Sequence, residues 1–213
     1  MRARSFVFLV FWFSLTPLLA ASAIFGCSYA PLAFDQPTDV AFGKDGAVFV
    51  SDGYGSSRVA KLSASGAFLL EWGEKGIGKG QFYTPHGITT DAEGRVYVAD
   101  RGNARIQVFD ADGAYSTEWK GKHLGRPWGI QTGADGFLYV VDGGDQDLER
   151  PRGRLLKLDR DGNVLASWGA PGSGAGQIDW GHDVSVGPDG SVFVVDIRGK
   201  RVQKFRPKAA PMP

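Results

Sequence analysis

The sequence predicts an all-β protein built from short strands and tight turns, and two observations lead to this class. Glycine and proline are frequent, with 31 and 11 residues among 213. Short Val-x-Val patches recur along the chain, as at 48–50 and 96–98, whereas no long stretch repeats its apolar residues with the 3.6-residue period of a helix. Such patches between turn residues are typical of β-strands.

Length and charge limit the classes of function. A chain of 213 residues has material for one ordinary domain. Its formal net charge of +1 at pH 7 provides no bulk charge that would attract nucleic acid. We therefore expect any activity to come from a local site.

The first residues have the pattern of a secretory signal. Arg2 and Arg4 precede an apolar run from Phe6 to Ala20, and small residues follow at 21–23. We therefore expect residues 1–23 to be a signal peptide. An uncleaved span of this kind also serves as an N-terminal membrane anchor. Residues 24–35 form a linker in either case.

Cys27 is the only cysteine of the chain, so the fold has no intrachain disulfide despite the oxidising compartment that export implies. The preceding residues, 24–26 (IFG), loosely resemble a bacterial lipoprotein cleavage site, which would make Cys27 a lipidated first residue. The alternative is an incidental cysteine beside the signal. We expect an exported protein, secreted or periplasmic, with membrane attachment only through this N-terminal segment.

An internal repeat determines the predicted architecture. A turn glycine and a run-ending aspartate recur together at intervals of 48, 42 and 54 residues. The glycines are Gly46, Gly94, Gly136 and Gly190, and the aspartates are Asp52, Asp100, Asp142 and Asp196. Four copies result, at about 36–73, 83–120, 126–169 and 179–207, followed by a tail at 208–213.

Each copy has the same order of elements. Two strands flank the glycine turn, and a third strand begins with Arg58, Arg105, Arg154 or Arg201. In the first three copies a second turn leads to a fourth strand that ends in Trp72, Trp119 or Trp168. Four antiparallel strands in a period of this length are typical of a propeller blade. The fourth copy lacks the outer strand, so the blades either close on themselves or form an incomplete, six-blade-like arc.

One column of the alignment places candidate ligands together. The residues eight positions before each turn glycine are Thr38, His86, Trp128 and His182. In a propeller the first strands line the central channel, so His86 and His182 are expected to converge there. Antiparallel geometry brings the loops between the second and third strands to the same face. Those loops carry Tyr54, Arg101 and the segment 143–146.

Specific motifs give a resemblance to a known family. The segments SDGY (51–54), PHG (85–87), ADR (99–101) and HD (182–183) occur in order within an NHL-type repeat. Together they resemble peptidyl-α-hydroxyglycine α-amidating lyase (peptidylamidoglycolate lyase), over nearly all of 36–207. The resemblance implies a carbon–nitrogen lyase that cleaves a C-terminal hydroxyglycine into a peptide amide and glyoxylate.

The resemblance also implies site residues. In that family three histidines hold a channel zinc, and His86 and His182 match two of them. Tyr54 matches the proposed base, and Arg101 matches an arginine that engages the substrate. Asp183 matches a position near a structural calcium. Imidazole nitrogens suit zinc, which acidifies a bound hydroxyl.

The chain departs from the family in one respect. The family has six blades, and this chain lacks the first two, which carry the third histidine and another arginine. A lyase would need a partner, a second copy or Asp183 to complete its zinc shell. The alternatives are a non-catalytic propeller that binds a peptide or small ligand at the channel mouth, and a scaffold that recruits a protein at open blade edges. His123 is expected in a surface loop.

Overall fold

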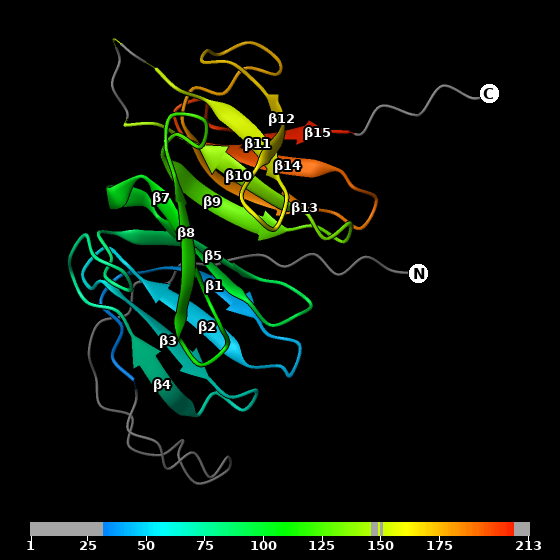
Figure 1. Ribbon diagram of the computed structural model, residues 1–213. Coiled ribbons are helices and arrows are strands. Elements are labelled where there is room, and N and C mark those ends of the chain that lie inside the picture. The colour runs from blue at the N-terminus through cyan, green and yellow to red at the C-terminus, as the bar shows by residue number, and fades with distance from the viewer. Residues whose placement is uncertain (1–31, 146–148, 150, 207–213) are drawn as a thin grey trace, which may run out of the picture. The chain divides into compact units, whose positions relative to one another are not determined.

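The computed structural model describes residues 32–145, 149 and 151–206, which form four antiparallel sheets (Figure 1). The predicted signal or anchor, Cys27, most of the linker, Gln146 and the tail lie outside the described residues. Three sheets have four strands each: β1 (Pro37–Phe42), β2 (Val48–Asp52), β3 (Arg58–Leu62) and β4 (Phe68–Trp72); β5 (Pro85–Thr90), β6 (Val96–Asp100), β7 (Arg105–Phe109) and β8 (Tyr115–Lys120); β9 (Pro127–Thr132), β10 (Leu138–Asp142), β11 (Arg154–Leu158) and β12 (Val164–Trp168).

The fourth sheet has three strands in the described part of the chain: β13 (Gly181–Val186), β14 (Val192–Asp196) and β15 (Arg201–Phe205). The all-β class and the four blades are thus as the repeat predicts. One short 3-10 helix, η1 (Arg101–Asn103), follows β6. We number the blades 1 to 4 in chain order.

The turn that joins the first two strands of each blade needs glycine. Its backbone φ lies between 73° and 90° at Gly46, Gly94, Gly136 and Gly190. This region is strained for residues that carry a Cβ atom. The recurring glycine in the sequence is therefore explained by the turn geometry.

Apolar contacts between consecutive blades form the core. Blade 1 packs on blade 2 through Phe49 and Val96, blade 2 on blade 3 through Ile106 and Val140, and three such clusters follow one another along the chain. Each blade therefore buries a face against its neighbour, as a propeller requires. The inner strands β1, β5, β9 and β13 surround a central cavity of about 410 Å³.

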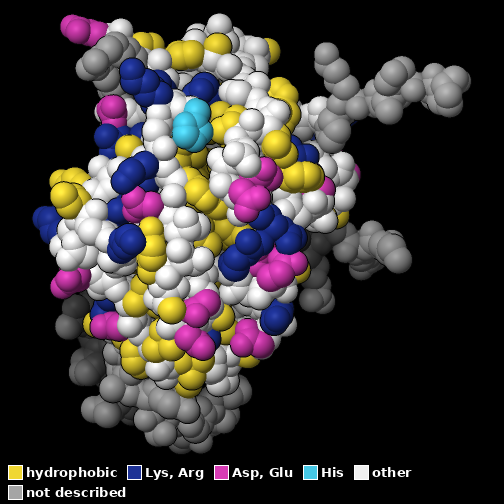
Figure 2. Space-filling model, viewed as in Figure 1, with side chains coloured by type: hydrophobic (Ala, Val, Ile, Leu, Met, Phe, Trp, Pro, Cys, Tyr) yellow, Lys and Arg dark blue, Asp and Glu magenta, His cyan; other side chains and the backbone are white. Residues whose placement is uncertain are grey.

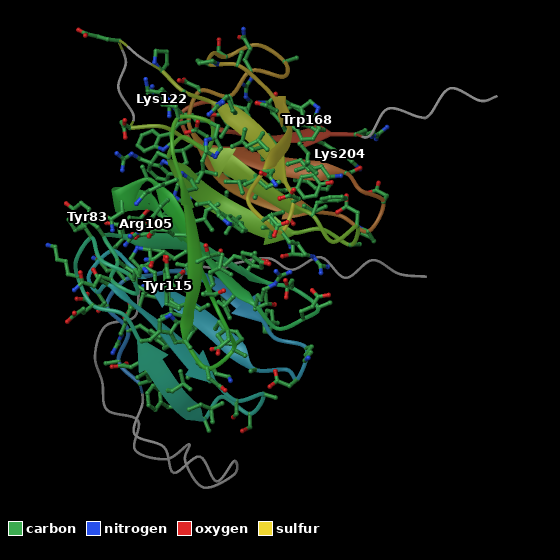
Figure 3. The ribbon with its side chains drawn as sticks, in the orientation of Figure 1. Tyr83, Arg105, Tyr115, Lys122, Trp168 and Lys204 are labelled. Carbon is green, nitrogen blue, oxygen red and sulfur yellow. The ribbon has the colours of Figure 1, made fainter. Side chains whose placement is uncertain are left out.

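Two of the three periodic tryptophans pack between blades. Trp72 and Trp119 do so, since each lies against the β3–β4-type turn of the next blade, at Gly113 and at Gly162. Trp168, on the outer strand of blade 3 (Figure 3), is 41% exposed. The equivalent turn of blade 4 would follow Phe205 and lies outside the described residues.

The repeated aspartates hold each blade together rather than acting in catalysis. Their carboxylates are buried, and each accepts a backbone N–H from the preceding inter-blade loop, as Asp100 does from Tyr83 at 2.8 Å. Each also pairs with the arginine that begins the third strand, at 2.7 Å for Asp100 and Arg105 (Figure 3). The four pairs are Asp52–Arg58, Asp100–Arg105, Asp142–Arg154 and Asp196–Arg201.

The two ends of the blade series are open. The face of blade 1 that points away from blade 2 exposes 47% of Val40 and 68% of Phe42, and the face of blade 4 that points away from blade 3 exposes 62% of Val202. Of the two arrangements left open by the sequence, these exposures fit the arc and not a closed ring of four. No helix in the described residues is long and apolar enough to cross a membrane.

Candidate functional site

The predicted histidine pair lies at one end of the channel. His86 is the second residue of β5 and His182 the second residue of β13, and their ring centroids are 4.6 Å apart at an angle of 80°. His86 is 3% exposed, and His182 is partly buried. The repeat places both residues at the same position of different blades, so their convergence follows from the propeller geometry.

The hydrogen bonds of His86 fix its tautomer. Its Nδ1 lies 3.0 Å from the backbone oxygen of Trp128. Because a carbonyl oxygen only accepts, Nδ1 carries the proton and Nε2 carries the lone pair. Tyr54 then donates its hydroxyl hydrogen to Nε2 at 3.0 Å. A lone pair directed by a bond at the other ring nitrogen is the arrangement found in histidines that bind metals.

Arg101 covers this pair from η1. Its guanidinium lies 4.0 Å from the centre of the Trp128 ring and 5.3 Å from that of Tyr54, and it donates to the Tyr54 hydroxyl at 3.5 Å. Arg101 makes no ion pair with a carboxylate of the described residues. A partly buried guanidinium without a carboxylate partner is an available anion-binding group.

Electrostatics keep both imidazoles neutral. Burial, the neighbouring His182 and Arg101 lower the pKa of His86 to about 3. Burial also lowers the pKa of His182, and the Arg101 charge acts in the same direction, while Asp183 opposes it. Neutral imidazoles are the form that donates electron pairs to a metal ion.

The loops expected at the histidine face are there. Tyr54 follows β2, and Arg101 follows β6, and the contacts above join both to His86. In blade 3, Gly144 accepts the indole N–H of Trp128 at 3.0 Å. His123 is exposed in the loop after β8, outside the histidine column, as the sequence predicts.

Asp183 faces the central cavity, whose lining does not include the two imidazoles. It lines the central cavity together with Asp39, which sequence reasoning did not select. Burial is the main cause that raises the pKa of both carboxyl groups, to about 6 for Asp39. The signal was present, because Asp39 occupies in blade 1 the position that Asp183 occupies in blade 4. Each repeat places this residue directly after the histidine column.

Trp180 is a second residue that sequence reasoning did not select. It directly precedes β13, and its ring centroid lies 5.7 Å from that of Trp128, which itself contacts both imidazoles. Its indole nitrogen is buried without a hydrogen-bond partner in the described structure. The site therefore has an aromatic wall on the side of blades 3 and 4.

The predicted metal ligands fit zinc only in part. His86 and His182 are neutral and close together, and the Nε2 lone pair of His86 is directed at the Tyr54 hydroxyl. Among the described residues, no group of three or more His, Cys, Asp or Glu side chains is placed to hold a metal ion. Asp183 thus does not complete the pair. Catalytic zinc ordinarily has three protein ligands.

The chain is similar to known amidating proteins. A family model for the NHL repeat matches residues 82–109. The chain is 35% identical over 205 residues to peptidyl-glycine alpha-amidating monooxygenase B of Xenopus laevis, covering 92% of this chain and 23% of that protein. It is 29% identical over 202 residues to peptidyl-alpha-hydroxyglycine alpha-amidating lyase 1 of Drosophila melanogaster, covering 84% of this chain and 37% of that protein.

A relative without an enzyme name matches a shorter part. The chain is 45% identical over 100 residues to NHL repeat-containing protein 3 of Homo sapiens, covering 45% of this chain and 27% of that protein. The chain therefore spans less than half the length of each of these three relatives.

Solved structures share the fold. Streptogramin B lyase aligns with a TM-score of 0.59 at 15% identity, covering 84% of this chain and 57% of that chain. Virginiamycin B lyase from Staphylococcus aureus aligns with a TM-score of 0.56 at 14% identity, with the same coverage of both chains. At these identities the likeness concerns the fold alone. The chain is an NHL-repeat β-propeller of four blades, similar over most of its length to a part of the peptidyl-glycine amidating proteins.

Proposed function

We propose that this propeller is a carbon–nitrogen lyase that cleaves peptidyl-α-hydroxyglycine into a peptide amide and glyoxylate. The observation that carries the proposal is the cluster of Tyr54, His86 and Arg101, in which the phenol lies 3.0 Å from an imidazole nitrogen and 3.5 Å from a guanidinium. The similarity to amidating proteins over most of the chain supports this substrate class.

Arg101 binds the substrate in this proposal. A C-terminal hydroxyglycine presents a carboxylate, and Arg101 is a guanidinium without a carboxylate partner among the described residues. Its stacking on Trp128 fixes the plane in which it donates. The carboxylate then places the neighbouring carbinol at Tyr54.

Tyr54 moves the proton. As the phenolate, it accepts the proton of the carbinol hydroxyl, whose oxygen becomes the carbonyl oxygen of glyoxylate. The bond between the carbinol carbon and the amide nitrogen breaks, and its electron pair stays on nitrogen, which takes the proton from the Tyr54 phenol to give the peptide amide and restore the phenolate. The positive charge of Arg101 offsets the negative charge of that phenolate. Zinc, held by His86 and His182 when bound, would supply Lewis acidity toward the hydroxyl.

A second candidate function is a non-catalytic propeller that binds a peptide, a small ligand or a protein partner. The observation that favours it is the absence of a third metal-ligating side chain beside the two imidazoles in the described residues. The aromatic wall of Trp128 and Trp180 and the charge of Arg101 suit a peptide C-terminus without any chemistry.

Two further proposals concern the surroundings of the site. We propose a structural calcium near Asp183, supported by the second carboxylate, Asp39, which lines the same cavity. We also propose export, supported by the pattern of residues 1–23. Isothermal titration of calcium into wild type and Asp183→Asn tests the first, and N-terminal sequencing of the protein recovered from the producing cell tests the second.

The deciding experiment combines metal content with glyoxylate release. Purified wild type, His86→Ala and Tyr54→Phe are analysed for zinc and assayed with a peptidyl-hydroxyglycine. His123→Ala is the matched control because that histidine is exposed and lies outside the site. We expect zinc to be lost only in His86→Ala, and glyoxylate release to fall about 100-fold or more in Tyr54→Phe with zinc retained.

Each outcome assigns one function. Zinc-dependent glyoxylate release that requires both Tyr54 and His86 supports the lyase. Wild type that binds no zinc and releases no glyoxylate refutes it. In that case, binding of an amidated or carboxylated peptide that is weakened by Arg101→Gln supports the second candidate.

A further inference from the structure

The three interfaces between blades follow one rule. Each blade has a leading face that packs on the next blade and a trailing face that packs on the previous one. Among the described residues, two faces of the series have no such neighbour: the trailing face of blade 1 and the leading face of blade 4. The repeat register and the strand pairing give the residues of each face. The trailing face of blade 1 comprises Val40, Phe42, Val48, Val50 and Leu62, and the leading face of blade 4 comprises Phe193, Val195 and Val202.

Exposure on the leading face of blade 4 departs from that of its equivalents. Val202 is 62% exposed, whereas Val59, Ile106 and Leu155, at the same position of blades 1 to 3, are all 0% exposed. Such a position is an interface position in every other blade. Blade 4 therefore has the side chains of an interface without its partner.

The trailing face of blade 1 shows the same contrast. Val40 is 47% exposed, whereas its equivalents Ile88, Ile130 and Val184 are 2%, 2% and 5% exposed. Phe42, on the same face, is 68% exposed. Exposed apolar side chains of this extent, gathered on one face, mark an interaction surface.

The chemistry of the two faces is complementary. Lys204 lies 5.0 Å over the Phe193 ring on the leading face of blade 4, and Lys61 lies 5.6 Å over the Phe49 ring on the leading face of blade 1. That lysine of blade 1 is buried against blade 2 and pairs with Asp112 at 3.2 Å. A lysine over an aromatic ring is thus compatible with blade packing. The trailing face of blade 1 offers Val40 and Phe42 to such a pair, and Ser65 stands at the position equivalent to Asp112.

We propose that these faces bind each other between two copies of the chain, with blade 4 of one copy packed on blade 1 of the other. Each copy then supplies the neighbour that the repeat rule demands, and the contact repeats the internal blade interfaces. The pairing is head-to-tail, so each copy presents one face of each kind and can contact two other copies. The proposal does not depend on the proposed lyase activity.

The test measures self-association of the full chain by sedimentation in a density-matched detergent buffer. Three variants each place one glutamate on an exposed apolar position. Phe42→Glu blocks the trailing face of blade 1, and Val202→Glu blocks the leading face of blade 4. Ile77→Glu is the matched control, since Ile77 is 83% exposed and lies on neither face.

We expect wild type and Ile77→Glu to associate, and Phe42→Glu and Val202→Glu each to sediment as monomers. An equimolar mixture of these two variants has one intact pair of faces and should associate again, but only into a 1:1 dimer, because each copy keeps one binding face. Circular dichroism confirms that each variant is folded.

Other outcomes overturn the proposal. Monomeric wild type means that the faces are bare or bind a different protein. Association of Val202→Glu alone indicates that two blade 1 faces pair with each other, and association of Phe42→Glu alone indicates the same for blade 4. Failure of the mixture to associate excludes the head-to-tail contact even if wild type is oligomeric.

Discussion

Arg105→Met tests whether the repeated Asp–Arg pair stabilises the fold. The Arg105 side chain is 5% exposed and pairs with Asp100 at 2.7 Å and Glu118 at 2.8 Å. It also donates to the backbone oxygens of the loop before β5, at Ile77 (2.9 Å), Gly78 (2.8 Å) and Gln81 (2.7 Å). Methionine keeps the apolar stem and removes the charge.

The magnitude follows from what remains around Asp100. Removing one partner of a buried ion pair costs about 3–5 kcal/mol, because the other charge stays buried. Asp100 still accepts from the Tyr83 backbone and from Asn103, so we expect the lower end, about 3 kcal/mol. For a domain of this size that lowers the melting temperature by about 6–12 °C.

Thermal unfolding followed by far-ultraviolet circular dichroism measures the effect, with Arg201→Met as the matched control. Arg201 makes the equivalent pair with Asp196 in blade 4, but its side chain is 25% exposed. Water can therefore compensate for its loss, and we expect roughly half the destabilisation. Equal losses in the two variants, or a shift below about 3 °C in Arg105→Met, would refute the argument from burial.

Three further predictions concern protonation and packing. In zinc-free protein, the free energy of unfolding should fall as the pH drops from about 6.5 toward 3. The reason is that the unfolded chain binds a proton at His86, whereas buried His86 in the folded protein, with its pKa of about 3, does not. Urea unfolding at several pH values should show a smaller fall in His86→Gln than in wild type. Asp39 acts with the opposite sign: its pKa of about 6 means that the folded protein binds more protons than the unfolded chain between pH 4 and 6, so stability is lost as the pH rises through that range. Asp39→Asn should abolish this loss in the same titration and still accept the Ile88 N–H. Gly113→Ala should lower the melting temperature more than Gly66→Ala. Both positions have positive φ, at 82° and 85°, but only at Gly113 does an added Cβ atom meet the Trp72 ring, at 2.8 Å. Equal losses of melting temperature would mean that backbone strain alone matters.

Much of the fold could be predicted from the sequence because the residues that recur in each repeat meet requirements of the local backbone and of contacts within one blade. A turn with positive φ requires glycine, so Gly46 and its equivalents mark the first turn of each blade. The buried acid and the arginine six or fewer residues apart in blades 1, 2 and 4 mark the second and third strands. These constraints act within one blade and are therefore visible in one repeat.

Part of the site was also predictable, since the register of the repeat places His86 and His182 in one column. Their convergence needed no more than the rule that inner strands surround a channel. The loop residues Tyr54 and Arg101 were found from antiparallel parity together with the family resemblance. Asp39 was accessible to the same register argument but did not stand out, because its neighbours in the column are Gly87 and Gly129.

Only the tertiary structure determined what depends on the neighbouring blade. The His86 tautomer is set by the Trp128 carbonyl 42 residues away. Asp183 lines the central cavity and does not form a group of three possible metal ligands with the two histidines. The same holds for the open faces. Val40 and Val202 occupy repeat positions that are interface positions in the other blades, and their exposure depends on whether a blade lies beside them. The sequence by itself determined each blade and its column of side chains, because those rest on local geometry, while the structure decided which surfaces meet, because burial is a property of two blades together.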